Sequence, residues 1–506
     1  MRAPEFAPMT INRRQLLNTG AASGAGLLAG AAFLQSSAAQ AAGSRSGSDN
    51  PRPLFPPLES SDGDPLALPP GFSYEVVSVS GETDLEDGSG KVIGKTPVRP
   101  DGTLVVTTST GYRLIQNHEV TPGEGETPAV PAVEGTVYDP GASDGGGCTV
   151  IDVDRSGKRV KEWVGLSGTA GNCAGGPTPW GTWLTCEETE DKAGTKGYQK
   201  DHGYVFEVFP AGPKKQSPLP IEAWGRAPHE AVVIEPNRRR VYLTEDASKP
   251  TGLLYRWTAP SGYTLQPYIA KSLGKDAGRL QALAVMAPDG GVLPDLAYVT
   301  SAQIGRPFRT SWVTVPDRHA ADTSLRKQFD DGQVTHSKKL EGAWGNDQGM
   351  YFVASFAFAA DIPANATPHD GQLWFYDYAE QTLTLVAYFP YNALLHSETV
   401  DPETGLGRSR DLAFDGPDGC HVSPYGSLVL TEDGSTANHV LSWSRQHGAQ
   451  AIARNLIVQE QNSNGQNVYS EMTGPCFSPD GRILFANVQE PGHVFAIKGP
   501  WEKYLG

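Results

Sequence analysis

Residues 172–188 read NCAGGPTPWGTWLTCEE, and this stretch decides the fold. A cysteine is followed by a turn rich in Gly and Pro, and a short apolar run then ends in two adjacent carboxylates. A run of β-type residues bounded by turn formers is typical of a β-strand. The outline returns as HEAVVIEPNRRRVYLTED at 229–246, DGCHVSPYGSLVLTED at 418–433 and EMTGPCFSPDGRILFANVQE at 471–490. The chain is therefore built from repeats.

The spacing within the repeats is nearly constant. An opening ligand-type residue and a strand-end position lie 14 or 15 positions apart in four copies: Cys173 to Glu187, Glu230 to Glu245, Glu341 to Ser355 and Asp418 to Glu432. In a fifth copy Glu471 lies 16 positions before Asn487. With the strand that ends at Asn117, this indicates six sheet modules. We therefore expect an all-β fold, a six-bladed β-propeller with long loop insertions.

Composition supports a β-rich chain and excludes one class of partner. The 506 residues include 58 Gly and 40 Pro, which interrupt any long helical pattern. The formal net charge is −16, and the chain has no basic tract beyond residues 238–240. Because such a charge repels a polyanion, we expect no nucleic-acid partner.

The N-terminus carries an export signal. Residues 12–17, NRRQLL, precede an apolar stretch rich in Ala and Gly at 21–33, and residues 39–41 read AQA. This pattern indicates a twin-arginine signal over residues 1–41, cleaved near Ala41. The apolar stretch is too short for a stable membrane span. We therefore expect a secreted or periplasmic protein whose transport partner is the twin-arginine export machinery.

After the signal, the chain is expected to divide into a lead-in and one domain. Residues 42–65 are expected to be a flexible lead-in, and residues 66–506 a single propeller domain with an insertion around 258–337. Within the insertion, residues 278–286 suggest a short helix. Residues 372–378 and 383–389 are expected to pair as a hairpin. We expect the mature protein to be a monomer.

Strand ends of a propeller converge on its axis, so distant repeats would place a ring of anionic groups there. Its members are Cys173, Glu187 or Glu188, Glu230, Glu341, Asp418 and Glu471. A single carboxylate of this kind is more typical of a solvated turn. Recurrence at the same phase of successive repeats favours a ring that holds cations. The five cysteines are odd in number, so at least one stays unpaired, and Cys173 in its Gly-rich turn is our candidate.

The ligand types predict the metals and the chemistry. Carboxylate oxygens suit Ca²⁺ or Mg²⁺, whereas a thiolate suits a softer metal such as iron. Clustered metals can hold a phosphate oxygen and activate a nucleophile, which favours hydrolysis of a phosphate ester. Lys339 or Arg226 could hold the remaining phosphate oxygens. On local grounds alone, Lys339 is more typical of a surface lysine in the run Lys338-Lys339.

At these residues the sequence resembles the PhoX family of secreted bacterial alkaline phosphatases. The resemblance covers most of the chain after the signal. Its most specific element is NCAGGPTPWGTWLTCEE, supported by NHE at 117–119, GRAPHE at 225–230, DG at 418–419 and EMTGPCFSPDG at 471–481. The resemblance implies a six-bladed propeller that holds Fe³⁺ and Ca²⁺ bridged by an oxide and hydrolyses small phosphomonoesters. The bridging oxide or hydroxide would be the nucleophile.

Carried over by position, the resemblance assigns roles to single residues. Cys173 becomes the iron-bound thiolate, and five carboxylates become metal ligands: Glu188, Glu230, Glu341, Asp418 and Glu471. Glu187 is the alternative to Glu188. Asn117 and Glu119 are placed near the substrate or calcium. The catalytic candidates are Asn117, Lys339 and Glu341, with Glu119 a further metal ligand.

Two positions depart from the family pattern. Lys339-Leu340-Glu341 stands where the family typically has Arg-Pro-Glu, so a planar phosphate clamp is replaced by a point charge. Glu490 stands where the family has a histidine. Two alternative functions are compatible with the same fold. One is a calcium propeller that hydrolyses lactones or phosphotriesters without iron or Cys173, and the other is a non-catalytic binding propeller that calcium stabilises.

Overall fold

The computed structural model describes residues 53–355, 370–390, 414, 416–434, 437–461, 465 and 467–506. The chain divides into two compact units, Met1–Gly47 and Ser48–Gly506. The expected signal peptide and its cleavage site lie outside the described residues. In the part of the chain that is described, no helix is both long and apolar enough to cross a membrane.

Two sheets come from the first part of the second unit, Ser48–Gly506. The order of the first is β4, β3, β8, β7, β6, β5, with bounds Val92–Lys95, Asp84–Glu86, Arg159–Thr169, Gly146–Asp154, Gly111–His118 and Pro100–Thr107. The order of the second is β11, β10, β9, with bounds Val205–Val208, Trp183–Glu187 and Asn172–Pro177. Pairing between strands that follow one another in the chain is antiparallel.

The middle of the chain forms one continuous ladder of nine strands. Its order is β12, β13, β15, β16, β17, β22, β21, β20, β19, with bounds His229–Ile234, Arg240–Glu245, Tyr255–Thr258, Arg279–Val285, Pro307–Thr314, Thr382–Phe389, Gly371–Asp377, Gly349–Ala354 and Leu340–Gly345. A two-stranded sheet beside it joins β14, Gly252–Leu253, to β18, His336–Ser337. The short helix α2 spans Ile269–Ser272.

The last two large sheets each combine C-terminal strands with one strand from near the start. One has the order β1, β26, β25, β24, β23, with bounds Leu66–Ala67, Gly448–Asn455, His439–Ser444, Leu428–Glu432 and Pro417–Val422. The other has the order β2, β31, β30, β29, with bounds Ser73–Val79, His493–Lys498, Ile483–Val488 and Met472–Phe477. A hairpin joins β27, Val458–Gln461, to β28, Asn467–Tyr469. These pairings tie the two ends of the unit together.

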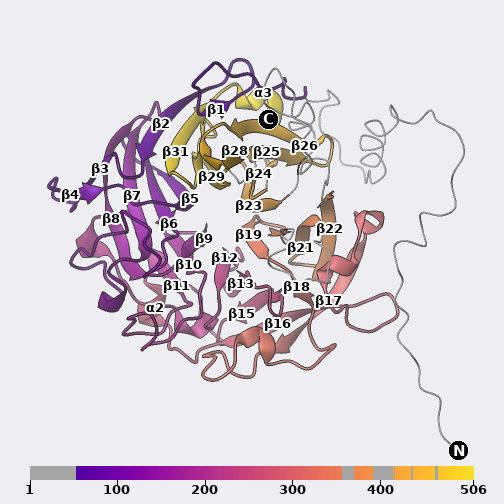
Figure 1. Cartoon of the computed structure of the whole chain (residues 1–506). Helices are drawn as coiled ribbons and strands as arrows, with labels where there is room; N and C mark the ends of the chain where they lie inside the picture. The colour runs from indigo at the N-terminus through magenta and orange to yellow at the C-terminus, as the bar shows by residue number, and fades with distance from the viewer. Residues whose placement is uncertain are drawn as a thin grey trace, which may run out of the picture. The chain divides into compact units, whose positions relative to one another are not determined.

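The first strands of the repeats surround a common axis. Around it β5 contacts β9, β9 contacts β12, β12 contacts β19, β19 contacts β23, β23 contacts β29, and β29 contacts β5. Figure 1 shows these strands at the centre of the unit and the later strands of each sheet farther out. The predicted all-β fold is confirmed, and its arrangement is propeller-like.

The core lies between neighbouring sheets. Trp183 and Phe206 of one sheet pack with Val150 and Leu166 of the preceding sheet in a single buried cluster. The early segment also contributes, because Phe55 stacks on Tyr504 of helix α3, Trp501–Leu505, with ring centroids 4.7 Å apart. Apolar faces that one sheet cannot bury alone are thus buried against its neighbours.

The structure corrects one local expectation and confirms another. The expected short helix at 278–286 is wrong, because this segment is strand β16, which pairs with both β15 and β17. Every residue of β16 after Arg279 is buried, and a run buried on both faces carries no period that separates strand from helix. The hairpin of β21 and β22 is confirmed.

Candidate metal centre

Five of the six inner strands have a β-bulge at the same place, whereas the bulge of β29 lies between Thr473 and Cys476. In five repeats the last regular pair before the bulge is Pro100 with His118, Asn172 with Glu187, His229 with Glu245, Leu340 with Ala354, and Pro417 with Glu432. Bulges release a residue from the ladder and re-aim its side chain. The residues that follow the pair are the potential ligands Asp101, Cys173, Glu230, Glu341 and Asp418.

A small residue follows each of these potential ligands. A Cβ on Gly102 would lie 2.9 Å from the Cα atom of Ala174, and a Cβ on Gly342 would lie 2.7 Å from the backbone nitrogen of Cys420. Real Cβ atoms do not approach backbone atoms so closely, so these positions require glycine. The glycines let neighbouring inner strands approach, and this approach brings the ligand side chains together.

A second set of acids stands one residue beyond the end of the second strand in four of the repeats. Its members are Glu119, Glu188, Asp246 and Asp433. In three of these repeats a backbone hydrogen bond to the residue just before the inner strand secures the acid: the N–H of Glu119 donates to the Arg99 carbonyl at 2.9 Å, that of Glu188 to Gly171 at 2.8 Å, and that of Asp433 to Gly416 at 2.9 Å. Four copies of the repeat therefore deliver two potential ligands each.

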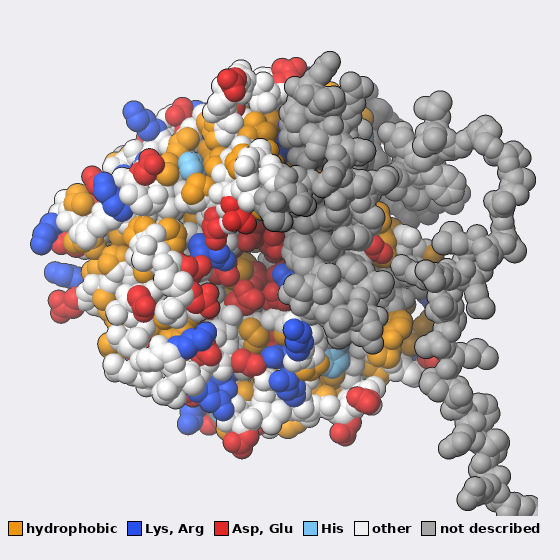
Figure 2. Space-filling model, in the orientation of Figure 1, with side chains coloured by type: hydrophobic (Ala, Val, Ile, Leu, Met, Phe, Trp, Pro, Cys, Tyr) orange, Lys and Arg blue, Asp and Glu red, His pale blue; other side chains and the backbone are white. Residues whose placement is uncertain are grey.

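The two sets meet in four overlapping groups whose ligand atoms lie within 4.8 Å of one another. The groups are Asp101, Glu119 and Cys173; Cys173, Glu188 and Glu230; Glu230, Glu341 and Asp418; and Asp418, Asp433 and Glu471. Figure 2 shows red Asp and Glu side chains gathered at the middle of one face, with blue Lys and Arg side chains beside them. The structure thus brings together Cys173, Glu188, Glu119, Glu230, Glu341, Asp418 and Glu471, as the sequence predicts.

The electrostatics of these groups favour bound cations. Burial, followed by the negative charge of neighbouring carboxylates, raises the pKa of Glu230 well above its usual value, and raises that of Asp418 to about 7. Burial and the same neighbours raise the pKa of the Cys173 thiol, whose Sγ lies 3.3 Å from Oε1 of Glu230. Oε2 of Glu230 is buried and has no hydrogen-bond partner in the protein. A cation would satisfy that oxygen and permit the whole set to ionise.

Lys339 lies beside this set with its ammonium group directed at two acids. Its Nζ is 2.9 Å from Oε1 of Glu341 and 3.5 Å from Oδ2 of Asp246. Although burial alone would lower the pKa of Lys339, these carboxylates raise it, so the side chain stays charged. Lys339 is therefore a largely buried, ion-paired lysine beside the acid groups and not a surface lysine.

Lys339 and Arg99 both occupy a backbone conformation that favours glycine. Their φ angles are 41° and 52°, and the equivalent residues Gly171 and Gly416 have φ angles of 56° and 52°. A non-glycine residue in this region costs about 1–2 kcal/mol. Strain of this kind is retained where a side chain is needed, and both side chains place positive charge beside the acids. Arg99 pairs with Glu119 at 2.8 Å.

The comparisons with known proteins agree with this geometry. Residues 53–492 match the family described as Alkaline phosphatase PhoX. The chain belongs to this family. Membership makes the protein a phosphomonoester hydrolase. No curated protein matches the chain.

Three solved structures are similar to this chain to different degrees. One similar structure is Pseudomonas fluorescens PhoX in complex with vanadate, a transition state analogue, with a TM-score of 0.60 and 17% identity over 88% of this chain and 98% of that one. The PQQ domain of Coprinopsis cinerea pyranose dehydrogenase has a TM-score of 0.31 and 10% identity, and covers 88% of this chain and 98% of that one. The periplasmic gluconolactonase PpgL of Pseudomonas aeruginosa has a TM-score of 0.30 and 11% identity, with 78% and 98% covered. Only the PhoX structure is similar enough to inform the fold.

Asn117, a catalytic candidate in this PhoX-family chain, is placed as a buried support. Its Nδ2 donates to the carbonyls of Cys173 at 2.7 Å and Ala174 at 2.8 Å. Its Oδ1 accepts from Nε1 of Trp183 at 2.9 Å and from Sγ of Cys148 at 3.1 Å. With both ends of the amide used, Asn117 holds the Cys173 segment in place and has no group directed at a substrate.

Two further candidates are held away from the acids. Glu187 is in none of the groups among the described residues, because its carboxylate accepts from Nδ1 of His202 at 2.6 Å and from the backbone N–H of Tyr204 at 3.1 Å. The guanidinium of Arg226 donates to carbonyls, including those of Glu190 at 2.6 Å and Ala320 at 2.7 Å. Of the two adjacent glutamates, Glu188 is therefore the one beside Cys173.

Sequence reasoning missed Asp101, Asp246 and Asp433. Two of them carried a signal: the motif TED ends both the 229–246 and the 418–433 copies, and the second acid of each motif faces the site. Asp101 opens the first inner strand in the triplet Pro-Asp-Gly, which matches Pro-Asp-Gly at 417–419. Aligning these motifs would have identified all three residues.

Proposed function

We propose that this PhoX-family protein hydrolyses small phosphomonoesters at a cluster of Fe³⁺ and Ca²⁺. The observation that carries the proposal is the chain of four overlapping acid groups, which includes one thiol and borders on Lys339. In the proposal Cys173 binds iron, and Glu188, Glu230, Glu341, Asp418, Glu471 and Glu119 supply oxygen ligands, with Asp101 and Asp433 added to the predicted set. Oxygen ligands suit calcium and a thiolate suits iron, so a mixed cluster fits the donors.

The protein's own residues would bind and orient the phosphate. Lys339 is charged, and its Nζ lies 2.9 Å from Oε1 of Glu341. Its ammonium group can therefore bind a phosphate oxygen at the edge of the acid groups. The cluster, when bound, supplies Lewis acidity and an oxide or hydroxide nucleophile. That the related Pseudomonas fluorescens protein binds vanadate supports a phosphoryl-transfer site in this fold. Asn117 acts by holding the Cys173 segment.

We also propose the wider organisation expected from the sequence. The six mutually contacting inner strands among the described residues support six blades in a single propeller over residues 66–506. The Arg-Arg motif and the AQA site support export by the twin-arginine machinery, with removal of residues 1–41 and release of a monomer into the periplasm or medium.

Elemental analysis of the purified mature protein, with an aryl phosphate assayed in parallel, tests the proposed function. Iron together with calcium and turnover of the ester are expected. The Cys173→Ala variant should lose iron and activity. Cys476→Ala, which removes a buried thiol outside the acid groups, should retain both.

Other outcomes would select the competing functions. Calcium without iron would favour the lactone or phosphotriester hydrolase, and calcium without turnover would favour a binding propeller. A fully active, iron-loaded Cys173→Ala protein would remove the iron assignment.

A further inference from the structure

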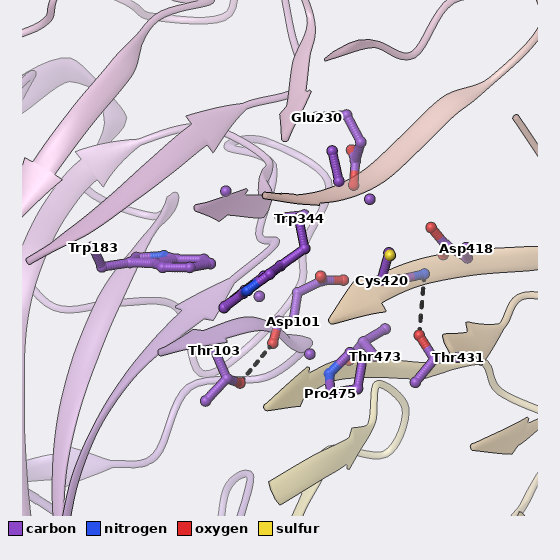
Figure 3. A pocket seen from close by; sticks show the side chains of 17 residues that line it. Asp101, Thr103, Trp183, Glu230, Trp344, Asp418, Cys420, Thr431, Thr473 and Pro475 are labelled. Atoms are coloured by element: carbon purple, nitrogen blue, oxygen red, sulfur yellow. Dashed lines mark hydrogen bonds between the residues drawn. The ribbon is translucent and has the colours of Figure 1, made fainter. Parts of the chain in front are cut away.

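A cavity lies on the inner side of the acid groups. Its lining includes the carboxylate residues Asp101, Glu230 and Asp418 and the indole residues Trp183 and Trp344. Figure 3 shows Trp344 projecting from its strand to lie between Trp183 and Asp101. We call the three acids the roof of the cavity and the two tryptophans its floor. The proposed chemistry gives the floor no role.

Trp344 is the member of this floor that joins several sheets. It lies on β19, three residues after Glu341, and packs against three separate hydrophobic clusters, which contain Cys476, Trp183 and Cys420 respectively. Because these clusters belong to different pairs of sheets, the indole reaches across the axis. Trp183 differs from Trp344 because it belongs to a single hydrophobic cluster. Its Nε1 donates a hydrogen bond to Oδ1 of Asn117.

The aromatic ring next to Trp344 carries no positive charge that could offset the charge of the acids. Its nearest aromatic neighbour is His421, whose ring centroid is 4.4 Å away in an edge-to-face arrangement. Burial lowers the pKa of His421 to about 3, so the imidazole is neutral at neutral pH. The floor is thus uncharged, whereas the roof consists of acids that burial makes difficult to ionise.

We infer that Trp344 is a positioning residue that closes the axial channel behind the metal centre and keeps water from the inner side of Asp101, Glu230 and Asp418. Exclusion of water strengthens the attraction between these carboxylates and a bound cation, because the local dielectric stays low. It also leaves the cluster one approach for solvent and substrate. The inference rests on the metal-binding part of the proposed function and does not depend on the substrate.

The test measures metal loss from the metal-loaded mature protein after EDTA is added, followed by elemental analysis. The Trp344→Gly variant should lose metal about ten- to a hundredfold faster than the unchanged protein, the range typical when residues around a metal site are removed. Trp344→Phe should stay close to the unchanged protein because it keeps an aromatic floor. Trp312→Ala is the matched control, since Trp312 is a partly buried tryptophan on the outer strand β17.

Chemical rescue separates a closed channel from general instability. An apolar cavity left by a deleted side chain can bind a small apolar molecule. Added indole should therefore return metal loss from Trp344→Gly to nearly the unchanged rate, with no effect on Trp312→Ala. A Trp344→Gly variant that keeps its metal, or one that indole does not rescue, would overturn the inference. So would equal acceleration in Trp312→Ala.

The outcomes also separate this inference from the proposed function. A protein that binds metal, shows the indole rescue and hydrolyses no phosphomonoester would contradict the proposed function and support the closed floor. If the unchanged protein binds no metal under any loading condition, the inference fails with the metal centre.

Discussion

Glu187 and Glu188 are consecutive residues at the end of β10, and their carboxylates serve opposite purposes. Glu187 accepts a 2.6 Å hydrogen bond from the buried His202, whereas Glu188 lies with Cys173 and Glu230 in one potential ligand group. Successive residues of a strand point to opposite faces, so the two glutamates cannot share a role. The same division separates Glu432, bonded to His439 at 2.7 Å, from Asp433.

Neutralising each glutamate in turn should therefore produce opposite phenotypes. Glu188→Gln is expected to lower metal content and phosphatase activity while leaving the free energy of unfolding almost unchanged. Glu187→Gln should cost about 3 kcal/mol of unfolding free energy, because it leaves His202 as half of a broken buried pair, and should retain metal in the folded fraction. Urea unfolding and elemental analysis of both proteins measure these effects. Metal loss confined to Glu187→Gln would reverse the assignment.

The division between the two faces explains which site residues the sequence could predict. The repeat spacing singles out Cys173, Glu230, Glu341 and Asp418, which the structure brings together because each lies at the start of an inner strand. The spacing is, however, counted to Glu187, Glu245 and Glu432. These three carboxylates form hydrogen bonds with buried side chains of the protein and do not belong to the acid groups. The β-bulge after each opening ligand shifts the pairing by one residue, and a two-residue period read along the strand does not show a bulge.

The surroundings of other candidate residues depend on partners that are distant in the sequence. The motif NHE suggested that Asn117 faces a substrate, but its hydrogen bonds to Cys173 and Trp183 join segments more than 50 positions away. Similarly, nothing local to Lys338-Lys339 shows that Lys339 adopts a left-handed backbone and points at Glu341. The fold class followed from turn formers and β-type runs, which are local properties.

Lys339 offers a test of the departure from the family's arginine. Lys339→Met should lower the rate of phosphomonoester hydrolysis about 10²- to 10³-fold, as loss of a charge-stabilising donor does elsewhere. Lys339→Arg should retain activity and lower KM, because a guanidinium can bind two phosphate oxygens at once. Lys338→Met is the neighbouring control and should behave like the unchanged protein. Steady-state kinetics with an aryl phosphate distinguish the three, and unchanged kinetics in Lys339→Met would contradict the assignment.

Asn117 should affect stability more than substrate binding. Asn117→Ala leaves the carbonyls of Cys173 and Ala174 without their donor and Nε1 of Trp183 without its acceptor, and each buried unsatisfied group costs about 1–3 kcal/mol. We expect a clear fall in the unfolding free energy, with KM unchanged in the folded protein. Asn237→Ala, which removes an exposed asparagine from a turn, should change neither quantity. A raised KM at normal stability would instead show that Asn117 contacts the substrate.

The metal-free protein should be most stable in acid and lose stability towards neutral pH. Burial raises the pKa of Asp418 from 3.8 to about 7, so the folded protein keeps a proton that the unfolded chain has released. Stability therefore falls as pH rises from the unfolded pKa to about 7 and then levels, by up to about 4 kcal/mol for this group alone. Urea unfolding of EDTA-treated protein at pH 5 and pH 8 measures the difference.

The matched variant and calcium should each remove this pH dependence by a different route. Asp418→Asn carries no proton to release, so its metal-free form should lose less stability between pH 5 and pH 8. Calcium should stabilise the unchanged protein most at pH 8, where its ligands are ionised and the ion competes with fewer protons. A metal-free protein that is more stable at pH 8 than at pH 5 would show that these carboxylates are solvated and that the acid groups do not form a buried cation site.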